Sequence, residues 1–310
     1  MNYKIVLGLI ILAILVFPYL PATTQTTGQF PSTIQWGVTT QQDIGILMVA
    51  QGDYDVFMFS NPLFWFDTLD PTVRANLTLI RTVTTFIDLV FNCAQNVIDP
   101  TQPGQVEIYG GYYPGQYIPG LLLINPGDFG FGSWVNWTDL NETHWPNLHW
   151  NPLAIREIRL AFNYLIDRDL IVSAIYHGSA AARYGAISSF HPFYSEVEDI
   201  YFTEFGFTPT GDLARALDLF NTALTNVNAT LLTYGMMLIY KPDPDAPAGK
   251  WLYFVKPDGT EEKVEINFVI RVEDERYDVG MQIASWIEQY FGIYVDRYPR
   301  ERTVIYTVYL

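Results

Sequence analysis

The side chains that most often carry catalysis or bind metals are sparse in this chain. Its four histidines are His144, His149, His177 and His191, and no cysteine or compact group of carboxylates accompanies them. His144 and His149 lie five residues apart, which is a poor spacing for two ligands of one metal ion. We therefore predict no metal centre and no cofactor.

Enzymatic motifs are also missing from the sequence. It contains no G-x-S-x-G, H-E-x-x-H, Walker A or G-x-G-x-x-G pattern. Asp139 and Glu142 lie near Trp137, and Glu157 follows, so a carboxylate pair of the glycoside-hydrolase kind stays open as an alternative. Proximity in the sequence does not set the separation that such chemistry needs, and we expect no enzyme.

Aromatic residues favour binding over catalysis. Flat, stiff rings in loops can stack on sugar rings or peptide side chains at little cost in entropy, although anchoring of the core is their more ordinary role. In α/β sheets, ligands gather at the carboxyl ends of strands. This rule selects candidate ligand-binding residues after two expected strands and in the loop after residues 151–178: Phe59, Ser60, Asn61, Phe91, Asn92, Phe190, His191 and Tyr194.

The composition is that of a well-packed, acidic protein. Among the 310 residues, 49% are hydrophobic and 16% aromatic, which excludes a disordered chain and allows one large or two modest domains. Only 16% are charged, and the formal net charge is −16. Nucleic acids and anionic lipids need a basic surface, so we expect neither as a partner. Cys93 is the single cysteine, so no internal disulfide can form.

The N-terminus has the pattern of a secreted protein. Lys4 precedes an apolar run over residues 5–16, which is short for a membrane span and typical of a secretory signal peptide. We expect residues 1–22 to be a signal peptide or an N-terminal anchor, and residues 23–32 a flexible spacer. The bulk of the chain is therefore expected outside the cytoplasm, at the cell surface or in a periplasm-like space.

Residues 151–178 predict two short helices in tandem. Asn151 is suited to cap the first helix, with Pro152 at its first position. Asp167 can cap the second helix, and Gly178 can end it in the left-handed conformation. Each helix carries an apolar stripe that must be buried, comprising Leu153, Ile158, Ala161, Phe162 and Leu165 in the first, and Leu170, Ile171, Ala174 and Ile175 in the second.

The same stretch resembles the signature of family 5 extracellular solute-binding proteins, the oligopeptide- and dipeptide-type receptors of ABC importers. The residues that carry the resemblance are 155–161 (IREIRLA), 163–168 (NYLIDR) and 171–178 (IVSAIYHG), with Leu165 where the family usually has Ala. Residues 41–59 and 264–295 are similar to further segments of the family. The resemblance covers most of the chain from about residue 33 onward and is most similar to archaeal members.

The expected elements alternate between strand and helix, which predicts an α/β fold. Strands are expected over 33–38, 54–59, 77–83 and 86–92, hairpins over 106–123 and between 251–255 and 264–271, and helices over 41–50, 211–224 and 278–290. The resemblance implies a periplasmic-binding-protein type II architecture of mixed sheets with flanking helices. We divide the chain into residues 33–150, with long Gly/Pro/aromatic loops, and residues 151–310, which carry the signature.

The resemblance implies a receptor rather than an enzyme. Such a receptor captures a peptide or an oligosaccharide outside the cell, closes its lobes around it and delivers it to the ABC permease subunits in the membrane. Family members continue beyond the point that corresponds to Leu310, so the resemblance also implies a chain truncated at its C-terminus with an incomplete second lobe. A secreted carbohydrate-active enzyme and a surface glycoprotein remain the alternatives.

Overall fold

The computed structural model describes residues 33–39, 41–58, 63–80, 87–93, 97–98, 106–107, 118–123, 143, 145–188 and 191–308. The chain divides into two compact units, residues 1–59 and 60–310. Residues 1–32, where we expect the signal peptide and the spacer, lie outside the described part.

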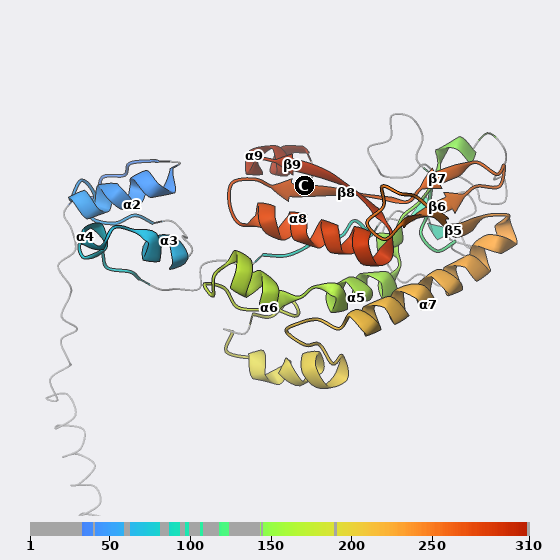
Figure 1. The fold of residues 1–310 in the computed structure, drawn as a ribbon, viewed down its shortest axis with the longest axis horizontal. Helices are drawn as coiled ribbons and strands as arrows, with labels where there is room; N and C mark the ends of the chain where they lie inside the picture. Colours follow the sequence, from blue (N-terminus) through green and yellow to red (C-terminus); the bar gives the residue numbers. More distant parts are fainter. Residues whose placement is uncertain are drawn as a thin grey trace, which may run out of the picture. The chain divides into compact units, whose positions relative to one another are not determined.

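Figure 1 shows the helices and strands in chain order. The α-helices are α2 (Gln42–Gln51), α3 (Leu63–Thr68), α4 (Pro71–Arg74), α5 (Arg156–Leu165), α6 (Arg168–Leu170), α7 (Leu213–Leu231), α8 (Arg276–Trp286) and α9 (Arg302–Val308). The strands are β1 (Val97–Ile98), β2 (Val106–Glu107), β3 (Leu121–Leu123), β4 (Leu148–Trp150), β5 (Met237–Pro242), β6 (Lys250–Val255), β7 (Glu261–Lys263), β8 (Glu265–Arg271) and β9 (Tyr294–Arg300). Short 3₁₀ turns are η3 (Trp145–Asn147), η4 (Pro152–Ala154), η6 (Tyr194–Glu196) and η8 (Leu232–Tyr234), and π-helical turns are η5 (Ile171–Ile175), η7 (Ile200–Glu204) and η9 (Ile287–Phe291).

The N-terminal half contains the helix that its sequence predicts but few of the strands. Helix α2 ends at Gly52, whose φ of 83° is left-handed, as glycine allows. The strands expected over 33–38, 54–59, 77–83 and 86–92 are wrong wherever these ranges are described, because none of those residues pairs in a sheet. Alternation of side chains does not supply the neighbouring strand that a strand's N–H and C=O groups require.

The tandem helices form with the predicted caps. Oδ1 of Asn151 accepts the N–H of Leu153 at 3.0 Å. This cap precedes the 3₁₀ turn η4 rather than the α-helix itself, and α5 begins only after Ile155, whose backbone is extended. Asp167 accepts the N–H of Leu170 at 2.8 Å at the start of α6. Helix α6 continues as the π-helical turn η5, and Gly178 follows it with a φ of 78°.

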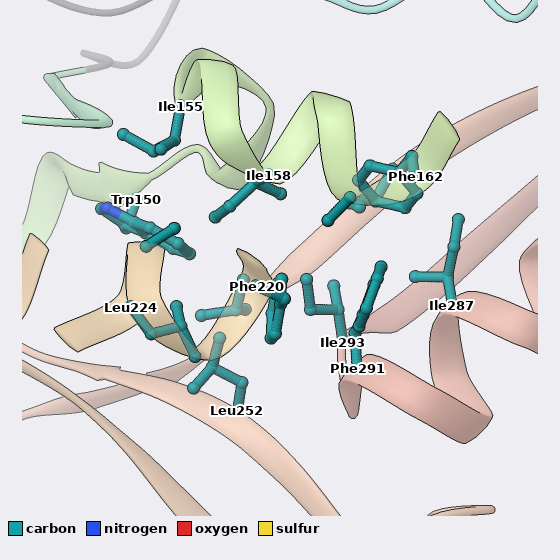
Figure 2. Packing of buried hydrophobic residues seen from close by; sticks show 14 of the residues in the cluster. Trp150, Ile155, Ile158, Phe162, Phe220, Leu224, Leu252, Ile287, Phe291 and Ile293 are labelled. Atoms are coloured by element: carbon teal, nitrogen blue, oxygen red, sulfur yellow. The ribbon is translucent and has the colours of Figure 1, made fainter. Parts of the chain in front are cut away.

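Helices α5 and α7 pack against each other over the core of the second unit. Figure 2 shows Phe162 from α5, Phe220 from α7 and Phe291 from η9 meeting at its centre. The ring of Phe291 stacks on Phe220 with 4.2 Å between centroids and meets Phe162 edge to face at 5.4 Å. All three are almost fully buried. Side chains of this size contribute about 1.5–3 kcal/mol each on burial, so this aromatic cluster is a main source of the unit's stability.

The strands of the second unit pair differently from the sequence-based expectation. Strand β6 forms its hairpin with β7 rather than with 264–271, and β5 completes an antiparallel sheet in the order β5-β6-β7. Strand β8 instead pairs in parallel with β9, through the helical connection of α8 and η9. The hairpin over 106–123 is also wrong, because β2 pairs with β1 and β3 pairs with β4.

Candidate ligand-binding site

Strands β8 and β9 form the one parallel pair among the described strands, and polar residues gather at their carboxyl ends. Ligands of α/β proteins bind outside the carboxyl ends of parallel strands, where loops and helix N-termini converge. Here β8 ends at Arg271, the loop to α8 carries Glu273 and Asp274, and β9 ends at Arg300. This end of the pair is therefore the best candidate for a ligand-binding site in the described part of the chain.

Two arginines and two carboxylates form an ion-pair network at the end of β8. The Nε of Arg271 lies 2.8 Å from Oε2 of Glu273, and its Nη2 lies 3.5 Å from Oδ2 of Asp274. Asp274 also accepts the Nε–H of Arg276 at 2.7 Å and the backbone N–H of Arg276 at 3.2 Å. Glu273 accepts the backbone N–H of Arg302, the first residue of α9, at 2.6 Å. The network thus ties the end of β8 to the starts of α8 and α9.

The pKa values of both carboxyls follow from these contacts. Burial alone would raise the pKa of Asp274, but the hydrogen bonds from Arg276 and the charges of Arg276 and Arg271 outweigh it, so the pKa lies below its ordinary 3.8. For Glu273, burial is likewise outweighed by hydrogen bonds from Arg302 and Arg271, and its pKa is also lowered. Both groups are therefore carboxylates at neutral pH and are neutralised by their arginines.

Tyr176 lies at the end of η5, and η5 packs against α8. Its hydroxyl is buried and has no hydrogen-bond partner among the described residues. Burial, followed by the negative charges of Glu275 and Asp274, raises its pKa to about 12. The hydroxyl therefore keeps its proton throughout the physiological range and is an unused donor next to the network.

Arg300 is a cation of this region for which the described residues provide no carboxylate partner. Its Nη1 donates to the carbonyl oxygen of Pro299 at 2.8 Å, and its guanidinium lies 5.8 Å from the ring centre of Tyr298. Within the described residues it forms no ion pair, and it is exposed. An exposed guanidinium can bind a carboxylate at two points, so Arg300 is the group of this site best suited to an anionic ligand.

The residues of the signature stretch have structural roles. The guanidinium of Arg168 donates to the carbonyl oxygens of Arg183 at 2.8 Å, Asn163 at 3.0 Å and Ile166 at 3.2 Å, and it lies over the ring of Tyr184 at 4.9 Å. It also binds the side-chain oxygen of Asn163. Burial lowers the pKa of Arg168. Arg168 therefore holds the chain around α5 and α6 in place.

The predicted ligand-binding residues fall into three groups. Phe59, Ser60, Asn61 and Phe190 lie outside the described residues. Phe91 packs its ring against Phe162 at 5.5 Å, at the edge of the core, and the carbonyl of the exposed Asn92 accepts from the Asn151 side chain at 3.0 Å. In the loop, His191 Nδ1 accepts the N–H of Phe193 at 3.2 Å, and Tyr194 lies 6.3 Å from the ring of Tyr201. A binding role for these residues remains a prediction.

Two absences hold for the part of the chain that the structure describes. No three His, Cys, Asp or Glu side chains lie close enough together to hold a metal ion. No helix there combines the length and the apolar character that crossing a membrane requires.

A comparison with protein families identifies the chain. Residues 104–270 match the model of the bacterial extracellular solute-binding proteins, family 5 Middle, which is more than half of the sequence. The chain belongs to this family. Its members are binding proteins, which confirms both the resemblance seen in the sequence and the prediction that the chain is not an enzyme.

Several solved structures of binding proteins are similar to part of the chain. The oligopeptide-binding protein of Thermus thermophilus complexed with a pentapeptide is 18% identical, with a TM-score of 0.31 over 48% of this chain and 20% of that one. AppA of Bacillus subtilis in complex with a nonapeptide is 18% identical, with a TM-score of 0.33 over 49% and 25%. NikZ of Campylobacter jejuni in complex with Ni(L-His) is 18% identical, with a TM-score of 0.26 over 48% and 24%. No curated protein matches the chain.

The chain thus spans a fifth to a quarter of the length of these relatives. The predicted α/β fold is confirmed in the described residues, and its assignment to the solute-binding proteins rests on the family match. The site at the ends of β8 and β9 was not among the residues chosen from the sequence. A signal for it existed, since the charged run from Arg271 to Arg276 directly follows an apolar strand and precedes a helix.

Proposed function

We propose that this family 5 protein is the extracellular substrate-binding component of an ABC importer, and that it captures oligopeptides for delivery to the membrane permease. The observation that carries the proposal is the family match over residues 104–270. The peptides in the related proteins of Thermus thermophilus and Bacillus subtilis favour a peptide as the solute. An oligosaccharide, the other solute that the sequence left open, has no support from these relatives.

Within this proposal, Arg300 binds the carboxylate terminus of the peptide. Its guanidinium is exposed, without an ion pair in the described residues, and is held beside Tyr298 at the carboxyl end of β9. The network of Arg271, Arg276, Glu273 and Asp274 holds the neighbouring end of β8 in place, and its two positive charges balance its two negative charges. Loss of a charge-assisted hydrogen bond costs about 1.5–3 kcal/mol, which corresponds to roughly tenfold to a hundredfold in affinity.

A thermal-shift titration tests this function on the 310-residue chain. The probes are penta-alanine, its C-terminal amide and cellopentaose, each over a wide concentration range. A ligand that binds the folded state raises the melting temperature with its concentration. We expect penta-alanine to do so, the amide to do so more weakly, and cellopentaose to have no effect.

The matched variants are Arg300→Gln and Arg156→Gln, the second being an exposed arginine at the start of α5. Arg300→Gln should weaken penta-alanine binding about tenfold or more, whereas Arg156→Gln should leave it unchanged. A shift with cellopentaose alone would instead support a carbohydrate-binding protein. The absence of any shift would contradict solute binding by this chain.

A further inference from the structure

Two N-x-S/T sequons lie within the described residues, and their local structures differ. Residues 76–78 (NLT) follow helix α4, and residues 228–230 (NAT) lie near the end of helix α7 (Figure 1). Two more sequons begin at Asn136 and Asn141, outside the described part. The sequon is the acceptor of N-linked glycans in proteins that leave the cytoplasm. Because so short a motif also occurs by chance, the surroundings of each sequon decide whether it can react.

Glycan transfer sets a geometric condition on the sequon. The transferring enzyme must hold the asparagine amide and the hydroxyl group two residues further on at the same time. In an extended chain the side chains of residues i and i+2 lie on the same side, whereas in an α-helix they point about 200° apart. A sequon inside a helix must therefore unwind before it can react.

The fold uses the side chain of Asn228. Its Oδ1 accepts the N–H of Leu238 at 2.6 Å, and its Nδ2 donates to the carbonyl oxygen of Leu238 at 2.9 Å. The amide thus pairs with strand β5 as the backbone of a neighbouring strand would. Asn228 is also half-buried and lies within α7. A glycan could be attached there only after α7 had opened and both hydrogen bonds had broken.

The sequon at Asn76 has the opposite character. Helix α4 ends at Arg74, and the N–H groups of Asn76 and Leu77 donate to the carbonyl oxygens of Val73 and Arg74, each at 3.1 Å. The residues that follow, up to position 80, belong to neither a helix nor a strand. The side chains of Asn76 and Thr78 are exposed and form no hydrogen bond within the described residues. Both groups can therefore enter an active site without unfolding of a helix.

We propose that Asn76 is an N-glycosylation site, modified outside the cytoplasm by transfer from a polyprenyl-diphosphate-linked oligosaccharide. Nδ2 of Asn76 forms a bond with C1 of the first sugar, and the bond from C1 to the diphosphate oxygen breaks. The diphosphate leaves with the electron pair, and the amide gives up one of its two protons. The proposal rests on the extracellular location in the proposed function but on neither the solute nor Arg300.

Peptide mapping by mass spectrometry tests the site on the chain recovered from the cells that naturally produce it. Trypsin cleaves after Arg74 and Arg81 and releases residues 75–81, whose one sequon is that of Asn76. The sequon of Asn228 lies in a separate peptide, residues 216–250. We expect a glycan on the first peptide and none on the second. An unmodified first peptide in all molecules would overturn the proposal, and a glycan on Asn228 would overturn the argument from its hydrogen bonds.

Substitutions at Thr78 show whether the sequon itself directs the modification. Thr78→Ser keeps the hydroxyl group that the sequon requires and should keep the glycan, whereas Thr78→Ala removes the hydroxyl and should lose it. Thr78 is exposed, so both variants should retain the melting temperature of the unglycosylated chain. A glycan that persisted on Asn76 in Thr78→Ala would overturn the proposal.

A reconstituted reaction separates the effect of structure from that of sequence. The unglycosylated, folded chain is incubated with a polyprenyl-diphosphate-linked oligosaccharide and an oligosaccharyltransferase that accepts any N-x-S/T sequon. Asn76 should react about tenfold faster than Asn228 or more, because the hydrogen bonds to Leu238 must first break. Synthetic peptides of residues 73–80 and 225–232 should react at similar rates. Equal rates in the folded chain would overturn the proposal.

The thermal-shift titration with penta-alanine distinguishes this proposal from that of solute binding. Asn76→Gln should lose the glycan and keep the shift in melting temperature. An unmodified Asn76 in a chain that responds to penta-alanine would overturn the glycosylation proposal alone. A chain that carries the glycan on Asn76 but does not respond to penta-alanine would overturn the solute-binding proposal alone.

Discussion

The guanidinium of Arg297 in β9 forms a two-point ion pair with the carboxylate of Glu288 in η9. Nη2 lies 2.6 Å from Oε2, and Nη1 lies 2.9 Å from Oε1. The Glu288 side chain is only 9% exposed, so its charge depends on this partner. The same carboxylate accepts the N–H of Val295, so the pair both neutralises a buried charge and closes the strand edge.

Replacing one partner of this pair should be strongly destabilising. Arg297→Met leaves the buried Glu288 without its counter-charge, and the expected loss in the free energy of unfolding is about 3–5 kcal/mol. Urea titration followed by near-UV circular dichroism measures it. The double variant Arg297→Met with Glu288→Leu should recover all but about 1 kcal/mol, the cost of the unpaired Val295 N–H. A single variant that loses less than about 1 kcal/mol would contradict the buried ion pair.

Arg168→Lys should destabilise the second unit although it keeps the charge. An ammonium group cannot reach the carbonyls of Arg183, Asn163 and Ile166 together or stack flat on Tyr184. We expect a loss of about 2–4 kcal/mol in the free energy of unfolding. Arg156→Lys, at an exposed position of α5, is the matched control and should cost less than about 0.5 kcal/mol. Equal effects of the two substitutions would refute the anchoring role of Arg168.

Glu262 in β7 should make stability fall in acid. It pairs with His149 of β4 at 2.7 Å and with the buried Lys256 at 2.9 Å. Burial alone would raise its pKa, but these two partners outweigh it, so the pKa lies below the ordinary 4.5. A carboxyl group whose pKa is lower in the folded than in the unfolded state stabilises the fold at pH values above its unfolded-state pKa. This stabilisation is lost as the pH falls through the folded-state pKa.

The measurement is the free energy of unfolding of the native chain and of Glu262→Gln at pH 7 and at about pH 3. At pH 7 the native chain should be more stable than Glu262→Gln, and this difference in the free energy of unfolding should be smaller at about pH 3. Glu204→Gln, at an exposed position, should cost less than about 0.5 kcal/mol at both values. A difference that grows in acid would contradict the sign of the pKa shift.

Gly280→Ala should be destabilising even though alanine favours helices. A Cβ atom at Gly280 would lie 2.7 Å from Cγ2 of Ile270 and 3.1 Å from its Cγ1, because α8 packs closely on β8. Overpacking of this kind costs about 1–3 kcal/mol, against a gain of about 1 kcal/mol in helix propensity.

Thermal or urea unfolding of the four proteins of a double-mutant cycle, with Ile270→Ala as the second substitution, measures this coupling. The combined variant should be more stable than the sum of the single effects predicts, because the alanine at 270 makes room for the new methyl group. Additive effects would show that α8 does not approach β8 as closely as the structure has it.

Local features of the fold could be predicted from the sequence because they depend on neighbouring residues. Asn151 and Asp167 cap the turns that follow them, and Gly52 and Gly178 end theirs in the left-handed conformation. The family resemblance rested on the same stretch. Its spacing predicts the caps and the buried face of α5, whereas Leu170 and Ala174, in the stripe expected to be buried in the second helix, are exposed. The strand expected over 264–271 and the helix expected over 278–290 were predicted in the same way, and β8 and α8 form there.

Tertiary structure decided which strands pair and where the candidate site lies. The periodicity of Val264 to Arg271 is the same for a hairpin with β6 and for a parallel pair with β9, since alternation gives the face of each side chain and not its neighbour. The parallel pairing brings Arg271 and Arg300, distant in the sequence, to one end of the sheet. Which strands pair has no local sequence signature, because the partners of backbone groups exist only once the chain has folded.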